Sequence, residues 1–387
     1  MTTQLSSALI SNRSRALCGL AGLALLSACA TLPASGPTAG EIKQGAKAEA
    51  NTIGFKIVDI DGPTLAGLMA RDKAADAAVP TFASLAETGR NDVVGPGDVL
   101  SVGVYEVGVS LFSAGHDTTQ SYDPSAHGQE FPSIVVDRDG AIRLPYVGRL
   151  QVAGHTAAEI QTMIEHALKG KSQNPQALVG IKQALSTTVY VTGDARRPGR
   201  MSLSLQRERL LDAIALAGGP AGSAEDTIVR FNRGDRTLEE RLGRIRAGAP
   251  DDLVLIPGDR IELIKRPRTF IVLGATSRVS QVPFETGDLS LAEAMARAGG
   301  PSDGQADPSA VFLFRYDPTG PDDASSTPII YRLNMLKPVS YFLSQRFEMH
   351  DKDVIYIANA SSIRPTKLVN IINQLFSPFI AARALSR

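Results

Sequence analysis

The sequence predicts an α+β protein built from small domains in tandem, followed by one amphipathic transmembrane helix at the C-terminus. Three observations support this fold class. A 32-residue pattern occurs at 189 and again at 270, without a gap and with 10 identities. An alternating strand follows the Gly-Pro-Gly-Asp turn at 95–98 and opens another α+β segment. Apolar and polar side chains in residues 366–387 separate onto two sides of a helix.

The first 28 residues have the parts of a bacterial lipoprotein signal peptide. Arg13 and Arg15 precede an apolar run from Ala16 to Leu26, which is too short to cross a bilayer. Leu-Ser-Ala then stands directly before Cys29, as in the box where a cysteine gains diacylglycerol and, after cleavage, an N-acyl chain. We expect residues 1–28 to be removed and Cys29 to be the lipid anchor. The alternative is an ordinary signal peptide with an incidental cysteine.

Composition excludes several classes of protein. The formal net charge is zero and there is no basic patch, so nucleic acid is not an expected partner. The second cysteine, Cys18, lies in the segment that is removed, so no disulfide can form within the mature chain. The five histidines form no zinc pattern, and no nucleophile elbow occurs. We expect no enzyme, no metal and no cofactor other than the lipid on Cys29.

Residues 29–90 are predicted to be a tether and a weakly structured segment, and residues 91–185 form the first domain. This domain has a strand after residue 98, two strands joined by an Asp-Gly turn, and a strand at QALVGIKQA. A helix of about 157–169 begins at Thr156, where Glu159 completes a capping box. Residues 107–131 are expected to be a long polar loop.

Residues 186–267 and 268–360 are two β-grasp-like modules, repeat 1 and repeat 2. Each has a strand, a glycine turn, a strand and a helix that ends at Gly-Gly-Pro. Gly218 and Gly299 suit the left-handed position after the helix. Each repeat then adds a strand (IVRFNR; VFLFRY) and a closing turn and strand (PGDRIELI; DKDVIYIA).

An aspartate recurs at the turn before a strand in the first domain and in both repeats. These residues are Asp98, Asp259 and Asp353. Short acidic side chains commonly accept backbone N–H groups within turns, so capping of the turn is the expected role.

Residues 361–387 are predicted to form an amphipathic membrane helix. The membrane-facing residues are Leu368, Val369, Ile371, Ile372, Leu375, Phe376 and Phe379, and the lumen-facing residues are Asn370, Asn373, Gln374 and Ser377. From 365 to 385 the helix would be about 30 Å long, which matches a hydrocarbon core. Polar side chains facing lipid are unfavourable, so a single copy should not span. In a ring of copies they would face a water-filled lumen.

Two other roles for this helix remain open. Its apolar side could pack on repeat 2, or the helix could lie flat on the membrane surface.

The ordered motifs resemble one known family. GPGDVLSVGVYE, DGAIRLPYVGRLQVAGHTAAEI and NPQALVGIKQALSTTVYVTGDARRPG are similar to the Wza-like outer-membrane polysaccharide export proteins. The resemblance covers residues 91–387 in the family's order. It implies a polysaccharide-export domain, two soluble-ligand-binding β-grasp modules and a ring of about eight copies closed by rotational symmetry. No sugar-binding residue is carried over.

The resemblance also implies the function and the partners. We expect an outer-membrane lipoprotein, mostly periplasmic, whose oligomeric channel exports capsular polysaccharide or exopolysaccharide. The expected partners are the translocated glycan, outer-membrane lipid and an inner-membrane co-polymerase or ABC-type exporter, and the C-terminus would lie at the cell surface. The alternative is a periplasmic sugar-binding or scaffold lipoprotein that forms no pore.

Overall fold

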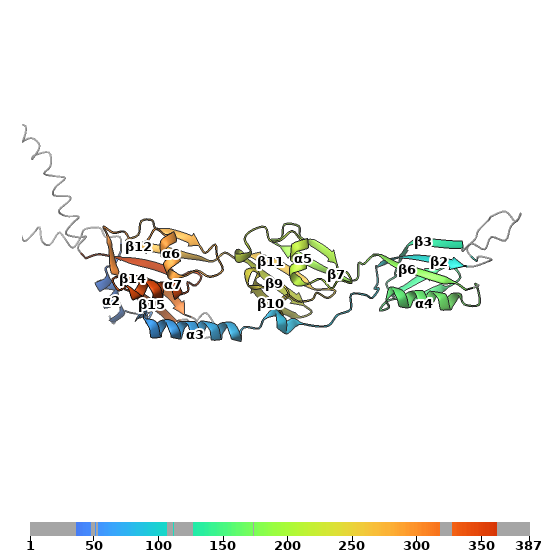
Figure 1. Cartoon of the computed structure of the whole chain (residues 1–387), viewed down its shortest axis with the longest axis horizontal. Coiled ribbons are helices and arrows are strands. Elements are labelled where there is room, and N and C mark those ends of the chain that lie inside the picture. The colour runs from blue at the N-terminus through green and yellow to red at the C-terminus, as the bar shows by residue number, and fades with distance from the viewer. Residues whose placement is uncertain are drawn as a thin grey trace, which may run out of the picture. The chain divides into compact units, whose positions relative to one another are not determined.

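The computed structural model describes residues 36–361 except 48–50, 52, 107–110, 112–126, 173 and 318–326. The predicted signal peptide, Cys29 and residues 362–387 lie outside the described residues, as does most of the predicted loop 107–131. By its internal contacts the chain divides into two units (Figure 1). One unit is Ala77–Pro267, and the other joins Met1–Asp76 to Arg268–Arg387.

The first domain is a three-stranded antiparallel sheet with one helix. Strands β2 (Val99–Glu106), β3 (His127–Val135) and β6 (Gln176–Gln183) lie in the order β3-β2-β6, and β4 (Ala141–Leu144) pairs with β5 (Gly148–Gln151). Helix α4 (Ala157–Leu168) covers one face of this sheet (Figure 1). The capping box of Thr156 and Glu159 is confirmed.

The core of the first domain follows from strand alternation. Leu100, Val102 and Val104 of β2 point to the α4 side and are buried. Ile160 and Ile164 of α4 are also buried in this cluster, because they lie four residues apart on one side of the helix. The opposite face of the sheet has no such helix over it in the described part of the domain.

Repeat 1 has a five-stranded sheet in the order β10-β9-β11-β7-β8. Its strands are β7 (Thr188–Gly193), β8 (Gly199–Ser202), β9 (Thr227–Arg233), β10 (Arg236–Arg241) and β11 (Arg260–Lys265). Helix α5 (Leu210–Leu216) and the short 3-10 helices η3 (Ala224–Asp226) and η4 (Leu242–Arg244) complete the module. The parallel pair β11–β7 brings the closing strand beside the first one.

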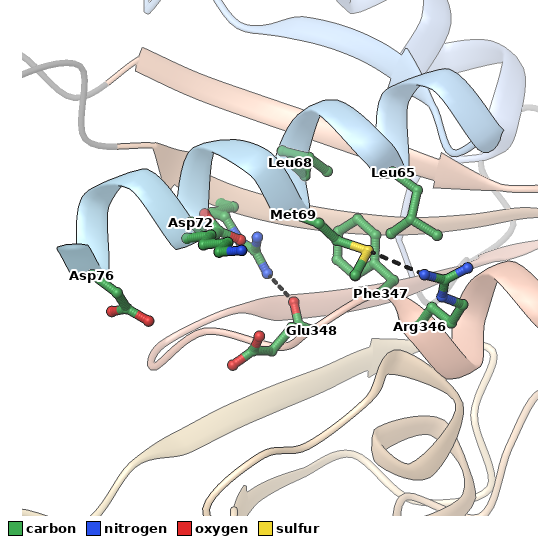
Figure 2. Close-up of a pocket in the computed structure, with 10 residues that line it drawn as sticks. Leu65, Leu68, Met69, Asp72, Asp76, Arg346, Phe347 and Glu348 are labelled. Carbon is green, nitrogen blue, oxygen red and sulfur yellow. Dashed lines mark hydrogen bonds between the residues drawn. The ribbon is translucent and has the colours of Figure 1, made fainter. Parts of the chain in front are cut away.

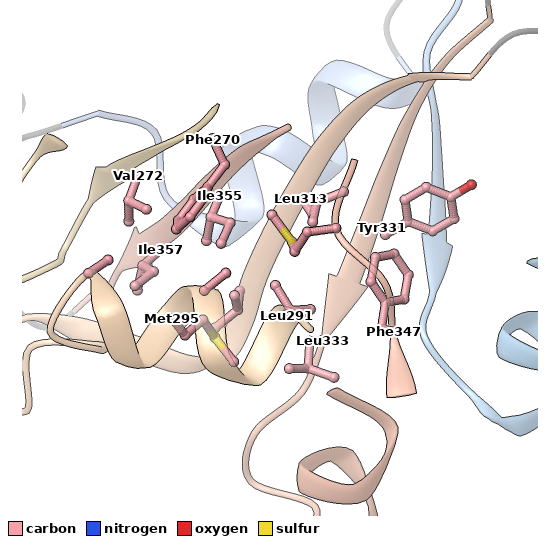
Figure 3. Packing of buried hydrophobic residues seen from close by; sticks show 14 of the residues in the cluster. Phe270, Val272, Leu291, Met295, Leu313, Tyr331, Leu333, Phe347, Ile355 and Ile357 are labelled. Carbon is pink, nitrogen blue, oxygen red and sulfur yellow. The ribbon is translucent and has the colours of Figure 1, made fainter. Parts of the chain in front are cut away.

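Repeat 2 has the same strand order, which supports the repeat found in the sequence. Its equivalent strands are β12 (Thr269–Gly274), β13 (Ser280–Pro283), β14 (Ala306–Asp317), β15 (Thr327–Leu333) and β16 (Val354–Asn359), with order β15-β14-β16-β12-β13. Helix α6 (Leu291–Arg297) is equivalent to α5, and α7 (Val339–Arg346) is additional. Figure 3 shows Phe270, Leu291, Met295 and Ile355 meeting in its core.

The glycines of the repeat occupy the expected conformations. Gly218 and Gly299 have φ of 81° and 83°, so the predicted left-handed position after each helix is confirmed. Gly193 and Gly274, also equivalent, have positive φ, and a Cβ on either would lie 2.1 Å from a backbone oxygen of the neighbouring strand. Only glycine fits there.

The prediction of weak structure between residues 29 and 90 is wrong for the described residues. Helix α2 (Ala39–Lys47), strand β1 (Lys56–Asp59) and helix α3 (Gly62–Ala78) belong to this segment. Strand β1 pairs in parallel with β15 and becomes the sixth strand of repeat 2. The 3-10 helix η2 (Phe82–Leu85) packs in repeat 1. Tertiary contacts with distant sequence therefore order a stretch whose own composition is weakly patterned.

Candidate functional site

The residues that the sequence assigns to the membrane cannot be placed. Cys29 and both sets of helix residues, from Leu368 to Phe379, lie outside the described part of the chain. Within the described part, no helix is long and apolar enough to cross a bilayer. The described residues nevertheless define where the two ends of the folded chain lie.

The first and last described residues lie together at the end of β16. Thr38 forms a parallel β-bridge with Asn359, and the Tyr356 hydroxyl donates to the Pro37 carbonyl at 2.7 Å. Gly36 lies so close to the same ring that a Cβ would be 2.5 Å from the Tyr356 hydroxyl oxygen. We call residues 36–38 with 356–361 the terminal junction. Because the bridge is parallel, residues 36–38 run alongside β16 in the same direction, and the described part of the chain begins and ends within this one junction.

The three turn aspartates cap their turns as predicted. Asp98 accepts from the Gly95 N–H at 2.8 Å and from the Leu185 and Ser186 N–H groups at 2.7 Å. The N–H of Ile256 donates to Asp259 at 2.8 Å, and the N–H of His350 donates to Asp353 at 2.7 Å.

Two of these aspartates also hold a buried arginine, which the sequence analysis missed. Arg233 of β9 donates from Nε and Nη2 to the two Asp259 oxygens at 2.9 and 2.6 Å. Arg315 of β14 does the same to Asp353 at 2.9 and 2.7 Å. The side chains of both pairs are at most 3% exposed. The missed signal is alternation, since each arginine is in phase with the inward residues of its strand.

Both arginines also donate to backbone carbonyl groups. Arg233 donates to Leu85 at 2.7 Å and to Val254 at 2.9 Å, so it ties η2 to repeat 1. Arg315 donates to the Glu348 carbonyl at 2.9 Å, the counterpart of Val254. The arrangement is structural, because the contacts of Arg233 lie within Ala77–Pro267 and those of Arg315 lie within repeat 2.

A narrow groove of about 240 Å³ runs between α3 and repeat 2. Figure 2 shows Leu65, Leu68 and Met69 on its helical side and Phe347 and Glu348 on the other. Arg346 Nη2 lies 3.9 Å from the Met69 sulfur.

His350 lies beside this groove, with Nε2 3.6 Å from Asp72. Burial lowers the pKa of His350 below its ordinary value, and the positive charge of Arg315 adds to this effect. Its neutral form is therefore favoured near pH 7. Among the described residues, at this groove and elsewhere, no three His, Cys, Asp or Glu side chains are placed to hold a metal ion.

Three family matches cover most of the described part of the chain. Residues 86–182 match the family described as Polysaccharide biosynthesis/export protein. Residues 188–241 and 268–357 each match the SLBB domain. The matches fall on the first domain, repeat 1 and repeat 2, in that order.

Whole-chain relatives agree with these matches. The chain is 32% identical to the capsule polysaccharide export protein BexD of Haemophilus influenzae, over 94% of this chain and 96% of the relative. It is 31% identical to the capsule polysaccharide export outer membrane protein CtrA of Neisseria meningitidis, over 94% and 93%. It is 30% identical to the EPS I polysaccharide export outer membrane protein EpsA of Ralstonia nicotianae, over 76% and 77%. The chain therefore belongs to the family of outer-membrane polysaccharide export proteins.

Proposed function

We propose that this protein is an outer-membrane lipoprotein whose copies form a ring and conduct capsular polysaccharide or exopolysaccharide to the cell surface. Family membership supports the cargo, since the relatives named above export capsule or exopolysaccharide. The terminal junction is the single structural observation that supports the membrane arrangement. The protein acts as a conduit and catalyses no reaction on the glycan.

The terminal junction supports membrane attachment at one end of unit 1. Six residues lie between Cys29 and Gly36, which gives a reach of about 25 Å at most. The predicted helix begins directly after the junction, at residue 361. Both segments therefore connect to unit 1 at the terminal junction, and this reach allows a lipid on Cys29 to attach to the same membrane as the predicted helix.

The composition of residues 366–379 supports a ring over a single spanning helix. In the bilayer, a lone copy would expose the amides of Asn370, Asn373 and Gln374 to lipid, which is unfavourable. In a closed ring of about eight copies these amides line a water-filled exit. The apolar side, from Leu368 to Phe379, then faces lipid.

The driving energy comes from a partner. The Gly-Pro-Gly-Asp turn of the first domain lacks the lysine of a phosphate loop. We assign this role to an inner-membrane co-polymerase or ABC-type exporter that delivers the glycan to the periplasmic side of the ring. Weak contacts with the moving chain suit this role, because tight binding would hold it in place.

Cysteine labelling in intact cells tests the membrane arrangement. After cleavage the chain keeps only Cys29, so a new cysteine is a unique target for a membrane-impermeant maleimide. We expect Ser386→Cys to be labelled in intact cells. The matched control is Leu205→Cys in repeat 1, where the side chain is 76% exposed, and it should be labelled only after the outer membrane is opened. Protection of Ser386→Cys in intact cells, with labelling after opening, would contradict a spanning helix.

A deletion strain tests the cargo. Loss of the protein should leave surface polymer absent and polymer retained inside the outer membrane, measured by fractionation with an antibody to the polymer. Normal surface polymer in the deletion strain would rule out the export role.

A further inference from the structure

The face of the first domain's sheet opposite α4 is rich in glycine. Strand alternation places Ser101, Gly103 and Tyr105 of β2 on this face, opposite the buried residues that meet α4. Register adds Gly128 beside Tyr105, Glu130 beside Gly103, and Gly180 beside Ser101. Three glycines on three neighbouring strands thus share one face with the ring of Tyr105.

The ring of Tyr105 lies over two of these glycines. A Cβ on Gly128 would be 2.7 Å from Cε1 of Tyr105, and a Cβ on Gly103 would be 3.2 Å from its Cε2. One face of the ring is therefore against the sheet. On the third strand, a Cβ on Gly180 would be 2.8 Å from the Ser101 hydroxyl oxygen. Side chains larger than glycine would displace the ring and the hydroxyl group.

A depression of about 530 Å³ occupies this face. Its rim carries Leu178, which is 60% exposed, the carboxylate of Glu130 and the ammonium group of Lys182. Lys182 Nζ lies 3.0 Å from the Ser133 hydroxyl oxygen, which places its charge near β3. The volume falls in the range of small-molecule sites, and an apolar floor with a few polar groups is their usual composition.

Sheet stability alone does not explain the glycines. A tyrosine beside a cross-strand glycine shields the backbone, which accounts for the pair of Tyr105 and Gly128. Gly103 and Gly180 are further glycines inside strands, where glycine weakens a sheet. Interior glycines also mark places where a ligand approaches the backbone closely.

We propose that this face is a contact site for the polysaccharide during export. One face of a pyranose ring presents mainly C–H groups, which pack against the electron-rich face of Tyr105. The sugar hydroxyls then reach the hydroxyl of Ser101, the carboxylate of Glu130 and the ammonium of Lys182, which are hydrogen-bonding groups of both kinds. The inference rests on the proposed function for the identity of the ligand. Contact is brief, because one aromatic surface binds a sugar only weakly.

The absence of tryptophan gives a direct test. The chain contains no Trp, so Tyr105→Trp places the only indole of the protein in this site. The full-length assembly is titrated with polysaccharide purified from the surface of the source strain. We expect a saturable change in Trp emission, and a smaller one with dextran of equal length. The matched control, Tyr190→Trp in β7, replaces another strand tyrosine, one that is 39% exposed and packs against Arg260, and its emission should not change.

Export by variants gives the second readout. Tyr105→Phe keeps the ring and should export like the parent, whereas Tyr105→Ala should slow the appearance of surface polymer by about two- to tenfold. Amide exchange in α4 shows whether each variant keeps the fold. Because Tyr105→Trp retains an aromatic ring, the titration remains decisive even where Tyr105→Ala unfolds the domain.

The outcomes separate this inference from the proposed function. Normal export in the deletion strain would refute the proposed export function, and with it the identification of the polysaccharide as the ligand. If deletion blocks export but the Trp emission of Tyr105→Trp does not change when polysaccharide is added, the contact site is refuted. The proposed export function is then still supported. An emission change that follows assembly of the copies, and not addition of polysaccharide, also refutes it, because the face is then covered by another subunit.

Discussion

The buried pair of Arg233 and Asp259 gives the sharpest prediction for stability. Asp259→Asn keeps the shape of the side chain but removes its charge. One oxygen is replaced by an NH2 group, so that group then faces either Arg233 Nε or both Arg233 Nη2 and the Ile256 N–H, all of which are donors. The arginine is left charged, 3% exposed and without a carboxylate. Removing one partner of a buried pair typically costs about 3–5 kcal/mol.

Hydrogen exchange in the full chain measures this loss within repeat 1. Since each 1.4 kcal/mol is a factor of ten, amides of β9 and β11 should exchange about 10²- to 10⁴-fold faster in Asp259→Asn. Repeat 2 and its β14 amides should be unaffected. Asp353→Asn should give the mirror result, with fast exchange in β14 and β16 and parental exchange in repeat 1.

Glu262→Gln is the matched control, because it removes the same charge three residues after Asp259, within β11. Glu262 pairs with Arg230 at 2.9 Å, but both side chains are more than a third exposed. Solvent screens such a pair, so exchange should change by less than about threefold. Equal effects of Asp259→Asn and Glu262→Gln would refute the argument from burial.

Three further predictions concern single residues. Burial holds the pKa of His350 below its ordinary value, so the unfolded state binds the proton first as pH falls below about 6.5. The stability of repeat 2 should therefore decline on acidification, and His350→Gln should reduce that dependence in amide exchange measured at several pH values. Thr156→Ala removes the N-cap of α4 and should destabilise the helix by about 1 kcal/mol, seen as faster exchange at its first turn. Gly274→Ala places a methyl group against a backbone oxygen and should lower the melting temperature of repeat 2, while Gly304→Ala, which has open space around it, should not.

Local sequence signals predicted much of the fold. The capping box at Thr156, the left-handed Gly218 and the aspartate turns each depend on residues within a few positions of one another. The repeat predicted equivalent strands because identical residues recur at a fixed offset. Caps and turns depend on which residue types stand a few positions apart, and these can be read directly from the sequence.

Features that depend on distant contacts were missed. Strand β1 has only four residues, and its partner β15 lies about 270 residues further along the chain. Helix α3 packs on repeat 2 through Leu65 and Leu68, and packing of this kind supplies most of the stability of a helix in a protein. The cluster of glycines around Tyr105 could not be predicted either. Its glycines come from three strands, and the register that brings them together cannot be read from the sequence.

The discontinuous make-up of unit 1 sets an order of events during folding. The chain is synthesised from its N-terminus, so residues 77–267 are complete before β15 exists. Strand β1 and helix α3 must wait, unpaired, until residue 333 has emerged. The earliest part of the chain to appear is thus among the last to acquire its partners, and in pulse-labelled refolding the amides of β1 should be protected together with those of β15.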